Sequence, residues 1–122
     1  AIRPYDTFLK WTVLDSIDLS RAMLYHAPFD GTSLIEANLN GAYLEGASFR
    51  AANLRQANLS WADLTGADFS GADLTGANLS YASLNGADFS KAKLKGAIVT
   101  TEQLENAHSL KDTVMPDGTI SE

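Results

Sequence analysis

The chain contains no cysteine, so it forms no disulfide and offers no thiolate to a metal ion. It has two histidines in 122 residues, and neither has a serine, cysteine or carboxylate at a spacing typical of a catalytic triad or a metal site. We therefore expect His26 and His108 to be surface residues. No apolar run approaches the roughly eighteen residues of a membrane-spanning helix, and no signal peptide is visible. These absences favour a soluble protein, with the cytoplasm preferred over a periplasmic or lumenal compartment.

What the chain does have is a five-residue period. Every fifth residue from Leu9 to Leu104 is apolar, without interruption. On an α-helix, residues five apart would scatter around the axis, and on a flat strand they would alternate between the two faces. All of these side chains point inward only if the chain turns a corner after each repeat. Each repeat is therefore predicted to form one side of a coil.

A second period, of twenty residues, indicates how many sides the coil has. Phenylalanine replaces leucine at the inward position only once in every twenty residues. Twenty residues at five per side make a four-sided coil, and the repeat tract makes about 4.5 coils. We predict one ladder of phenylalanines in the core and a ladder of leucines on the next side. The predicted ladder residues are Phe29, Phe49, Phe69, Phe89, Leu34, Leu54, Leu74 and Leu94.

Three other positions of the repeat have predicted structural roles. Alanine lies two residues before the inward position at every repeat from Ala37 to Ala97, where only a methyl group fits. Eight of the nine glycines lie two residues after it, at corners where a positive φ favours glycine. Aspartate or asparagine often precedes it directly, and we expect these side chains to accept backbone N–H bonds at the bends. A two-carboxylate site at Asp68 and Asp88, which are twenty residues apart, is the alternative.

The tandem pattern, as in Ala62-Asp63-Leu64-Thr65-Gly66, resembles the pentapeptide-repeat family. The match covers residues 34–98 closely and residues 7–33 in a degenerate form. The resemblance implies an all-β solenoid, a right-handed quadrilateral β-helix, and is poorly specific for function. We predict a single domain over residues 1–122, with an N-terminal cap over 1–8, the β-helix over 9–99 and a C-terminal helix and tail over 100–122.

Both ends of a solenoid need covering, because an end coil exposes its core and its backbone edge. Thr100 followed by Gln103 predicts a capping box that opens a short helix over 101–108, with Leu104 and Ala107 on its inner side. This helix is expected to close the C-terminal end. With both ends covered, we expect a monomer. The candidates for N-terminal cover are Ile2, Tyr5, Phe8 and Trp11.

One outward column contains residues that fit a partner-contact site. Arg21, Gly41, Trp61 and Tyr81 are spaced by twenty residues and should lie one above another at one corner of the coil. Tryptophan, tyrosine and arginine dominate the binding energy of protein interfaces. We therefore regard Trp61, Tyr81 and Arg21 as possible partner contacts, and simple aromatic packing over the corner is the alternative.

A core filled by ladders leaves no cleft for a substrate, so the sequence favours a non-enzymatic scaffold or protein-interaction module. We predict no catalytic residue, cofactor or metal site, and a protein partner of unknown identity, with no direct nucleic-acid binding and no membrane contact. Lys91, Lys93 and Lys95 are interpreted as a solvated edge.

The alternative function is suggested by members of the family that mimic DNA and inhibit type II topoisomerases. The net charge of −6 points in that direction. However, a rod of about 22 Å is short, and duplex DNA of that length carries about 13 charges.

Overall fold

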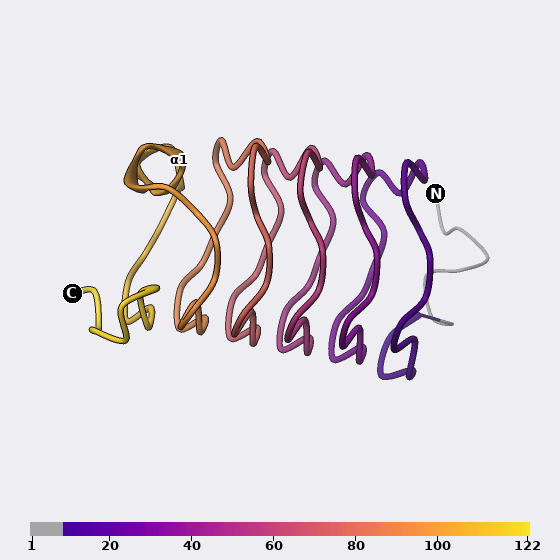
Figure 1. Ribbon diagram of the computed structural model, residues 1–122, viewed down its shortest axis with the longest axis horizontal. Helices are drawn as coiled ribbons and strands as arrows, with labels where there is room; N and C mark the ends of the chain where they lie inside the picture. The colour runs from indigo at the N-terminus through magenta and orange to yellow at the C-terminus, as the bar shows by residue number, and fades with distance from the viewer. Residues whose placement is uncertain (1–8) are drawn as a thin grey trace.

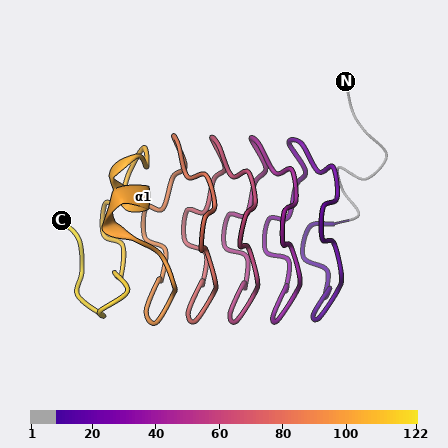
Figure 2. The same ribbon diagram turned by 45° about the horizontal axis from the view of Figure 1, so that its top comes forward.

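The computed structural model describes residues 9–122 as a stack of coils along one axis, with the N-terminal coils at one end and the C-terminus at the other (Figures 1 and 2). Parallel bridges join residues twenty positions apart, beginning with Val13–Ser33 and continuing to Asn78–Ile98. One turn of the coil therefore takes twenty residues, which is the longer of the two periods in the sequence.

The sides of the coil are too short for continuous strands. Within residues 9–122, the pairing between coils consists of isolated bridges, and the helix α1 is the only regular element. Each side still satisfies its backbone: the Leu54 N–H donates to the Asp73 carbonyl of the next coil at 2.7 Å, and the Asn58 N–H donates back to Ala37 at 2.9 Å. The corner between them is closed by the Ala57 N–H, which donates to the Leu54 carbonyl at 3.0 Å.

The inward residues form the predicted ladders. Phe29, Phe49, Phe69 and Phe89 are all 0% exposed, and successive rings are nearly parallel, with centroids 5.1, 4.9 and 5.1 Å apart. The four leucines of the next side, from Leu34 to Leu94, are also completely buried. The alanine positions are buried too, so a methyl group there completes the core. A fully buried leucine or phenylalanine contributes about 1.5–3 kcal/mol, which makes these columns the main stabilising feature of the coil.

The corners require an unusual backbone. The eight glycines predicted at corners have φ between 64° and 71°. Other residues take the same left-handed conformation at equivalent corners, including Ala51 at 57° and Trp61 at 62°. Because this conformation costs an L-residue roughly 1–2 kcal/mol, a large side chain at a corner is retained against a local penalty.

A short helix, α1 (Thr101–Glu105), occupies one side of the last coil. The predicted capping box is present: the Thr100 side chain accepts from the Gln103 N–H, and the Gln103 side chain accepts from the Thr100 N–H. Leu104 is buried at the inward position. The helix is shorter than the expected range of 101–108, because the Asn106 N–H already turns back to Gln103 and Leu104 as the C-cap.

The coil resumes after α1 with one extra residue. In the preceding coil, one residue makes both bonds: the Asp88 N–H donates to the Ala67 carbonyl, and the Asp88 carbonyl accepts from the Phe69 N–H. In the last coil, His108 donates to Ala87 while Ser109 accepts from Phe89, so two residues oppose one, as in a β-bulge. Later bridges are accordingly twenty-one residues apart, as in Lys93–Val114.

The expected boundary at residue 99 is therefore not where the coil pairing ends. After the last bridge to the preceding coil, a turn at Pro116-Asp117-Gly118 reverses the chain, and Val114 forms an antiparallel bridge with Ile120. This hairpin covers the outer edge of the last coil on one side.

At the N-terminal end, Ile2, Tyr5 and Phe8 lie outside the described residues. Trp11 is 75% exposed and lies at a corner. No helix within residues 9–122 has the length and hydropathy to span a membrane.

Candidate functional site

The aromatic pair predicted in the outward column forms a stack. The Trp61 and Tyr81 ring centroids are 4.4 Å apart with an angle of 17° between the ring planes. The two side chains remain 63% and 72% exposed, so the stack lies on the surface. Both residues take the left-handed corner conformation, with φ of 62° and 61°. Two large apolar side chains are thus displayed side by side at positions that favour glycine.

Neighbouring corners show which way such side chains lie. A methyl group added at Gly31 would collide with the Trp11 ring, and one added at Gly46 would collide with the His26 ring. Each of these side chains therefore lies over the corner of the following coil, twenty residues further on. Trp61 follows the same rule by lying on Tyr81. The corner after Tyr81 is residue 101, where α1 begins.

An open groove of about 470 Å³ lies between the aromatic pair and α1. Its lining is mainly apolar and carries no charged side chain. Ile98, at one wall, is 57% exposed. The lining residues are Trp61, Ser80, Tyr81, Ala82, Ile98, Val99, Thr100 and Gln103.

Gln103 holds the α1 side of this groove in place. Its Nε2 donates to the Leu79 carbonyl at 2.7 Å and to the Ala82 carbonyl at 3.0 Å, while its Oε1 accepts from the Thr100 N–H at 2.9 Å. The sequence predicted the capping contact of Gln103. It did not predict the two bonds to the preceding coil, because no repeat position marks them.

The start of α1 also leaves a backbone donor open at the groove. In the coil before, the Trp61 N–H donates to the Ser80 carbonyl at 2.9 Å. The equivalent acceptor for Tyr81 is the Thr100 carbonyl, which instead accepts the first helical bond of α1 from the Leu104 N–H at 3.2 Å. Within residues 9–122, the Tyr81 N–H consequently makes no hydrogen bond.

Arg21 is exposed at the same corner but lies apart from the aromatic pair. Its Cγ would be 3.5 Å from a methyl group at Gly41, so it covers the corner directly before that of Trp61. The structure therefore brings Trp61 and Tyr81 together, and leaves Arg21 outside the groove.

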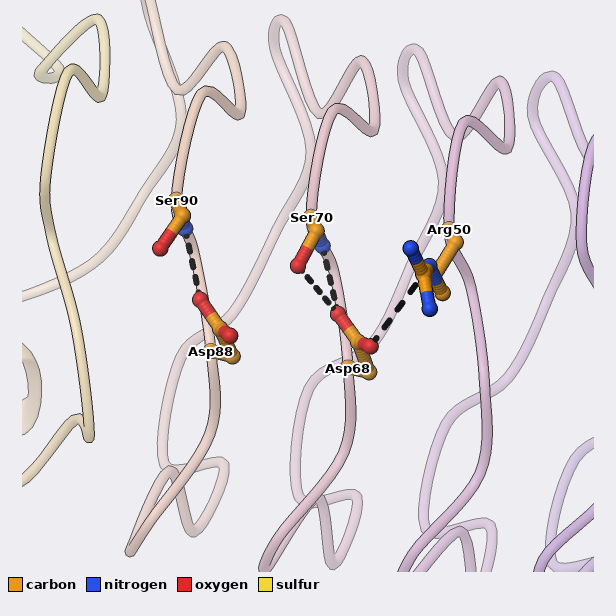
Figure 3. Close-up of polar contacts among 5 residues, drawn as sticks. All are labelled: Arg50, Asp68, Ser70, Asp88 and Ser90. Carbon is orange, nitrogen blue, oxygen red and sulfur yellow. Dashed lines mark hydrogen bonds and ion pairs between the residues drawn. The ribbon is translucent and has the colours of Figure 1, made fainter.

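The aspartates of the repeat stabilise bends, as expected. The Asp68 Oδ1 accepts from the Ser70 N–H at 2.9 Å, and the Asp88 Oδ1 accepts from the Ser90 N–H at 2.9 Å (Figure 3). Asp68 and Asp88 are bridge partners, but Asp68 also faces Arg50, whose Nε is 3.8 Å from its Oδ2. Among the described residues, no group of three or more His, Cys, Asp or Glu side chains is arranged to hold a metal ion.

A carboxyl pair involves Asp63, which follows Trp61 by two residues along the chain. Glu45 and Asp63 belong to neighbouring coils, and their hydrogen bond raises the pKa of Glu45, with repulsion from the Asp63 carboxylate adding to the effect. His26 and His108 are exposed.

A second hollow, of about 370 Å³, lies at the C-terminal end of the core. The inward residues of the last coil form its base, namely Val99, Leu104, Leu110 and Met115. Thus α1 and the hairpin cover this end only in part, which corrects the expectation that the helix closes it.

Comparison with known proteins places the chain in a family. A model for pentapeptide repeats, in eight copies, matches residues 9–41, 32–71 and 67–100. No curated protein matches the chain.

Among solved structures, a pentapeptide-repeat protein from the thylakoid lumen of Arabidopsis thaliana is 33% identical, with a TM-score of 0.53 over 83% of this chain and 78% of that one. HetL, a pentapeptide-repeat protein involved in heterocyst differentiation regulation in Nostoc sp. strain PCC 7120, is 40% identical, with a TM-score of 0.47 over 89% of this chain. The chain spans about half of the length of HetL, since the match covers 53% of that protein. With its repeat tract matched throughout and its coils built on twenty residues, the chain belongs to the pentapeptide-repeat family.

Proposed function

We propose that the protein is a non-enzymatic protein-interaction module built on a right-handed quadrilateral β-helix, and that Trp61 and Tyr81 form its partner-contact site. The observation that carries the proposal is the exposed aromatic stack beside an open apolar groove. Large exposed apolar patches mark interaction sites, and tryptophan and tyrosine are enriched among the residues that dominate binding energy.

The exposure of the two residues supports a role beyond core packing. Each takes a left-handed φ at a corner where glycine would avoid the penalty of roughly 1–2 kcal/mol. Neither side chain contributes to the buried core. The same φ occurs at nine other non-glycine residues within residues 9–122, so the exposed stack of the two rings, rather than their backbone, distinguishes this corner.

The outward charges favour this function over DNA mimicry. Arg50 lies against Asp68, so a positive charge interrupts the acidic surface in space as well as in sequence. Lys91, Lys93 and Lys95 are all exposed. This surface therefore does not carry the unbroken array of negative charge that a DNA mimic needs.

The proposal is tested by affinity capture from an extract of the source organism. The bait is the intact protein, compared with the double variant Trp61→Ser/Tyr81→Ser and with Trp11→Ser, which removes an exposed tryptophan from another corner. We expect a partner that is retained by the wild type and by Trp11→Ser and is lost with the double variant. Equal affinity of the purified partner for all three proteins would overturn the assignment. Circular dichroism and thermal melts confirm that the variants fold.

A further inference from the structure

We propose that the groove between Tyr81 and α1 binds an extended, basic segment of a partner protein, with an arginine stacked on the Tyr81 ring and a main-chain carbonyl accepting the Tyr81 N–H. This inference rests on the proposed function and names the chemistry of the segment that is bound.

The backbone provides the first argument. At most coil edges, an N–H of this kind donates to the carbonyl of the following coil, as the Trp61 N–H does to Ser80. The Tyr81 N–H lacks this partner because α1 takes up the Thr100 carbonyl. An extended peptide that enters the groove supplies the missing carbonyl in the same direction. It thereby replaces one hydrogen bond between coils, in the manner of strand addition to a sheet edge.

The aromatic stack provides the second argument. Trp61 packs on Tyr81 and Tyr81 lines the groove, so the pair offers the groove a ring surface that no following corner residue covers. A guanidinium that lies flat on such a ring is attracted by its negative face. An exposed ring face favours arginine over lysine, because the planar guanidinium both stacks on the ring and is attracted to its negative face.

Charge complementarity provides the third argument. The groove itself has no charged lining residue, and the nearest charged positions along the chain are acidic. Asp63 follows Trp61 by two residues, while Glu102 and Glu105 lie exposed on α1. With a net charge of −6, the whole molecule attracts a cationic segment and repels an acidic one.

The size and the apolar walls provide the fourth argument. A volume of about 470 Å³ lies within the usual range of ligand sites. Ile98 and Val99 also line the groove and offer aliphatic contact, so an arginine flanked by aliphatic residues fits the lining.

The test is a titration of the isotope-labelled protein with three defined peptides, followed by amide NMR. The probe is acetyl-valyl-arginyl-valine amide. The controls replace arginine with citrulline, which is planar and neutral, or with glutamate. We expect the arginine peptide to shift the Tyr81 amide and the Trp61 indole signals saturably, to slow hydrogen exchange of the Tyr81 N–H, and to bind about fivefold more tightly than the citrulline peptide. The glutamate peptide should bind more weakly still.

Variants of Tyr81 test whether its ring, rather than the rest of the surface, binds the peptide. Tyr81→Phe should retain binding because the ring face is kept, whereas Tyr81→Ala should lose it. Trp11→Ala serves as the matched control, since it removes an exposed tryptophan outside the groove, and it should bind as the wild type does.

Several outcomes would overturn the inference: no shift at Tyr81 or Trp61 up to about 5 mM peptide, equal affinity for arginine and citrulline, or unchanged binding by Tyr81→Ala. Concentration-dependent dimerisation abolished by the same variant would assign the groove to a second copy of the chain instead. If partner capture still depends on Trp61 and Tyr81 while the arginine peptide fails to bind, the proposed function stands and only the basic-segment inference falls.

Discussion

At the scale of the residue, the corner is the position whose backbone conformation carries a penalty for residues other than glycine. Gly66 and Ala51 occupy equivalent corner positions, with φ of 68° and 57°. A methyl group at Gly66 would have no atom within 4 Å, so any cost of adding it there comes from the backbone alone. The two positions therefore isolate the conformational penalty from packing.

We predict opposite effects for the two reciprocal substitutions. Gly66→Ala should lower the free energy of unfolding by about 1 kcal/mol, because alanine must hold a left-handed φ. Ala51→Gly should raise it by about 0.5 kcal/mol, because relief of that strain exceeds the entropy that glycine adds to the unfolded chain. Urea unfolding measures both. Ala52→Gly, at a buried methyl position next to Ala51, is the control and should destabilise. A loss of stability for Ala51→Gly similar to that of the control would contradict the argument.

Carboxylates at the bends predict an acid dependence of stability. The Asp18 Oδ1 accepts from the Ser20 hydroxyl at 2.7 Å, and the Asp117 Oδ1 accepts from the Thr119 hydroxyl at 2.6 Å. These bonds, together with those from the backbone N–H groups, lower the pKa of both aspartates. Because the pKa is lower in the folded state than in the unfolded state, the stabilisation is complete above about pH 4 and is lost as the pH falls through the lowered values.

The double variant Asp18→Asn/Asp117→Asn tests this pH dependence. Asparagine keeps a side-chain oxygen that accepts the same bonds but does not titrate. Between about pH 6 and about pH 3, the variant should therefore lose less unfolding free energy than the wild type in urea titrations. Parallel losses in the two proteins would show that these bends do not contribute to the acid dependence.

At the scale of the element, α1 is stabilised more by one side chain than by its own length. Five residues are too few for a helix to persist alone. Gln103 joins the helix to the preceding coil through the Leu79 and Ala82 carbonyls and closes its N-terminus at Thr100. The helix thus depends on a hydrogen-bonded side chain that is itself half-buried.

Removal of this side chain should loosen the C-terminal end. We predict that Gln103→Leu lowers the free energy of unfolding by about 1–3 kcal/mol, because it removes the donor of the Ala82 carbonyl and leaves the Leu79 carbonyl with the Ala82 N–H alone. Hydrogen exchange should show faster exchange at the Leu104 amide. Glu105→Gln, exposed on the same helix, should change stability by less than about 0.5 kcal/mol. A Gln103→Leu protein as stable as this control would show that the coil does not need the link.

The elements show where sequence reasoning succeeds and where it stops. The ladder from Phe29 to Phe89 was predictable because each inward position repeats the same local environment. The bulge at His108 and Ser109 was not, because one extra residue breaks the period without leaving a compositional mark. The groove was missed for a related reason: it arises where α1 removes an acceptor from Tyr81, and only the path of the backbone reveals that loss.

At the scale of the whole molecule, the coils behave as nearly equivalent layers. Each contacts its neighbours through the same bridges, so stability should change with the number of layers rather than collapse when one is removed. Trp61 and Tyr81 lie after residue 51, in later coils than the one chosen for deletion.

We predict that deletion of residues 32–51, one complete coil, leaves a cooperatively folding protein with a lower melting temperature. The stack of Trp61 on Tyr81 should persist, as near-ultraviolet circular dichroism would show. Deletion of residues 32–52 is the matched control: it removes one more residue, breaks the five-residue repeat at the junction and should abolish cooperative melting. Similar melting of both deletions would contradict the layered description.

The direction in which the corner side chains lie gives the molecule a polarity. The Trp11 and His26 rings each rest on the glycine of the next layer, so each ring already contacts another layer of the protein. Tyr81 is placed differently, because the backbone beyond it departs into α1. A column of corners therefore has a terminus at which its last member faces solvent instead of another layer. New binding specificity can be acquired at such a terminus by changing one or two side chains, while every layer beneath it continues to fold as before.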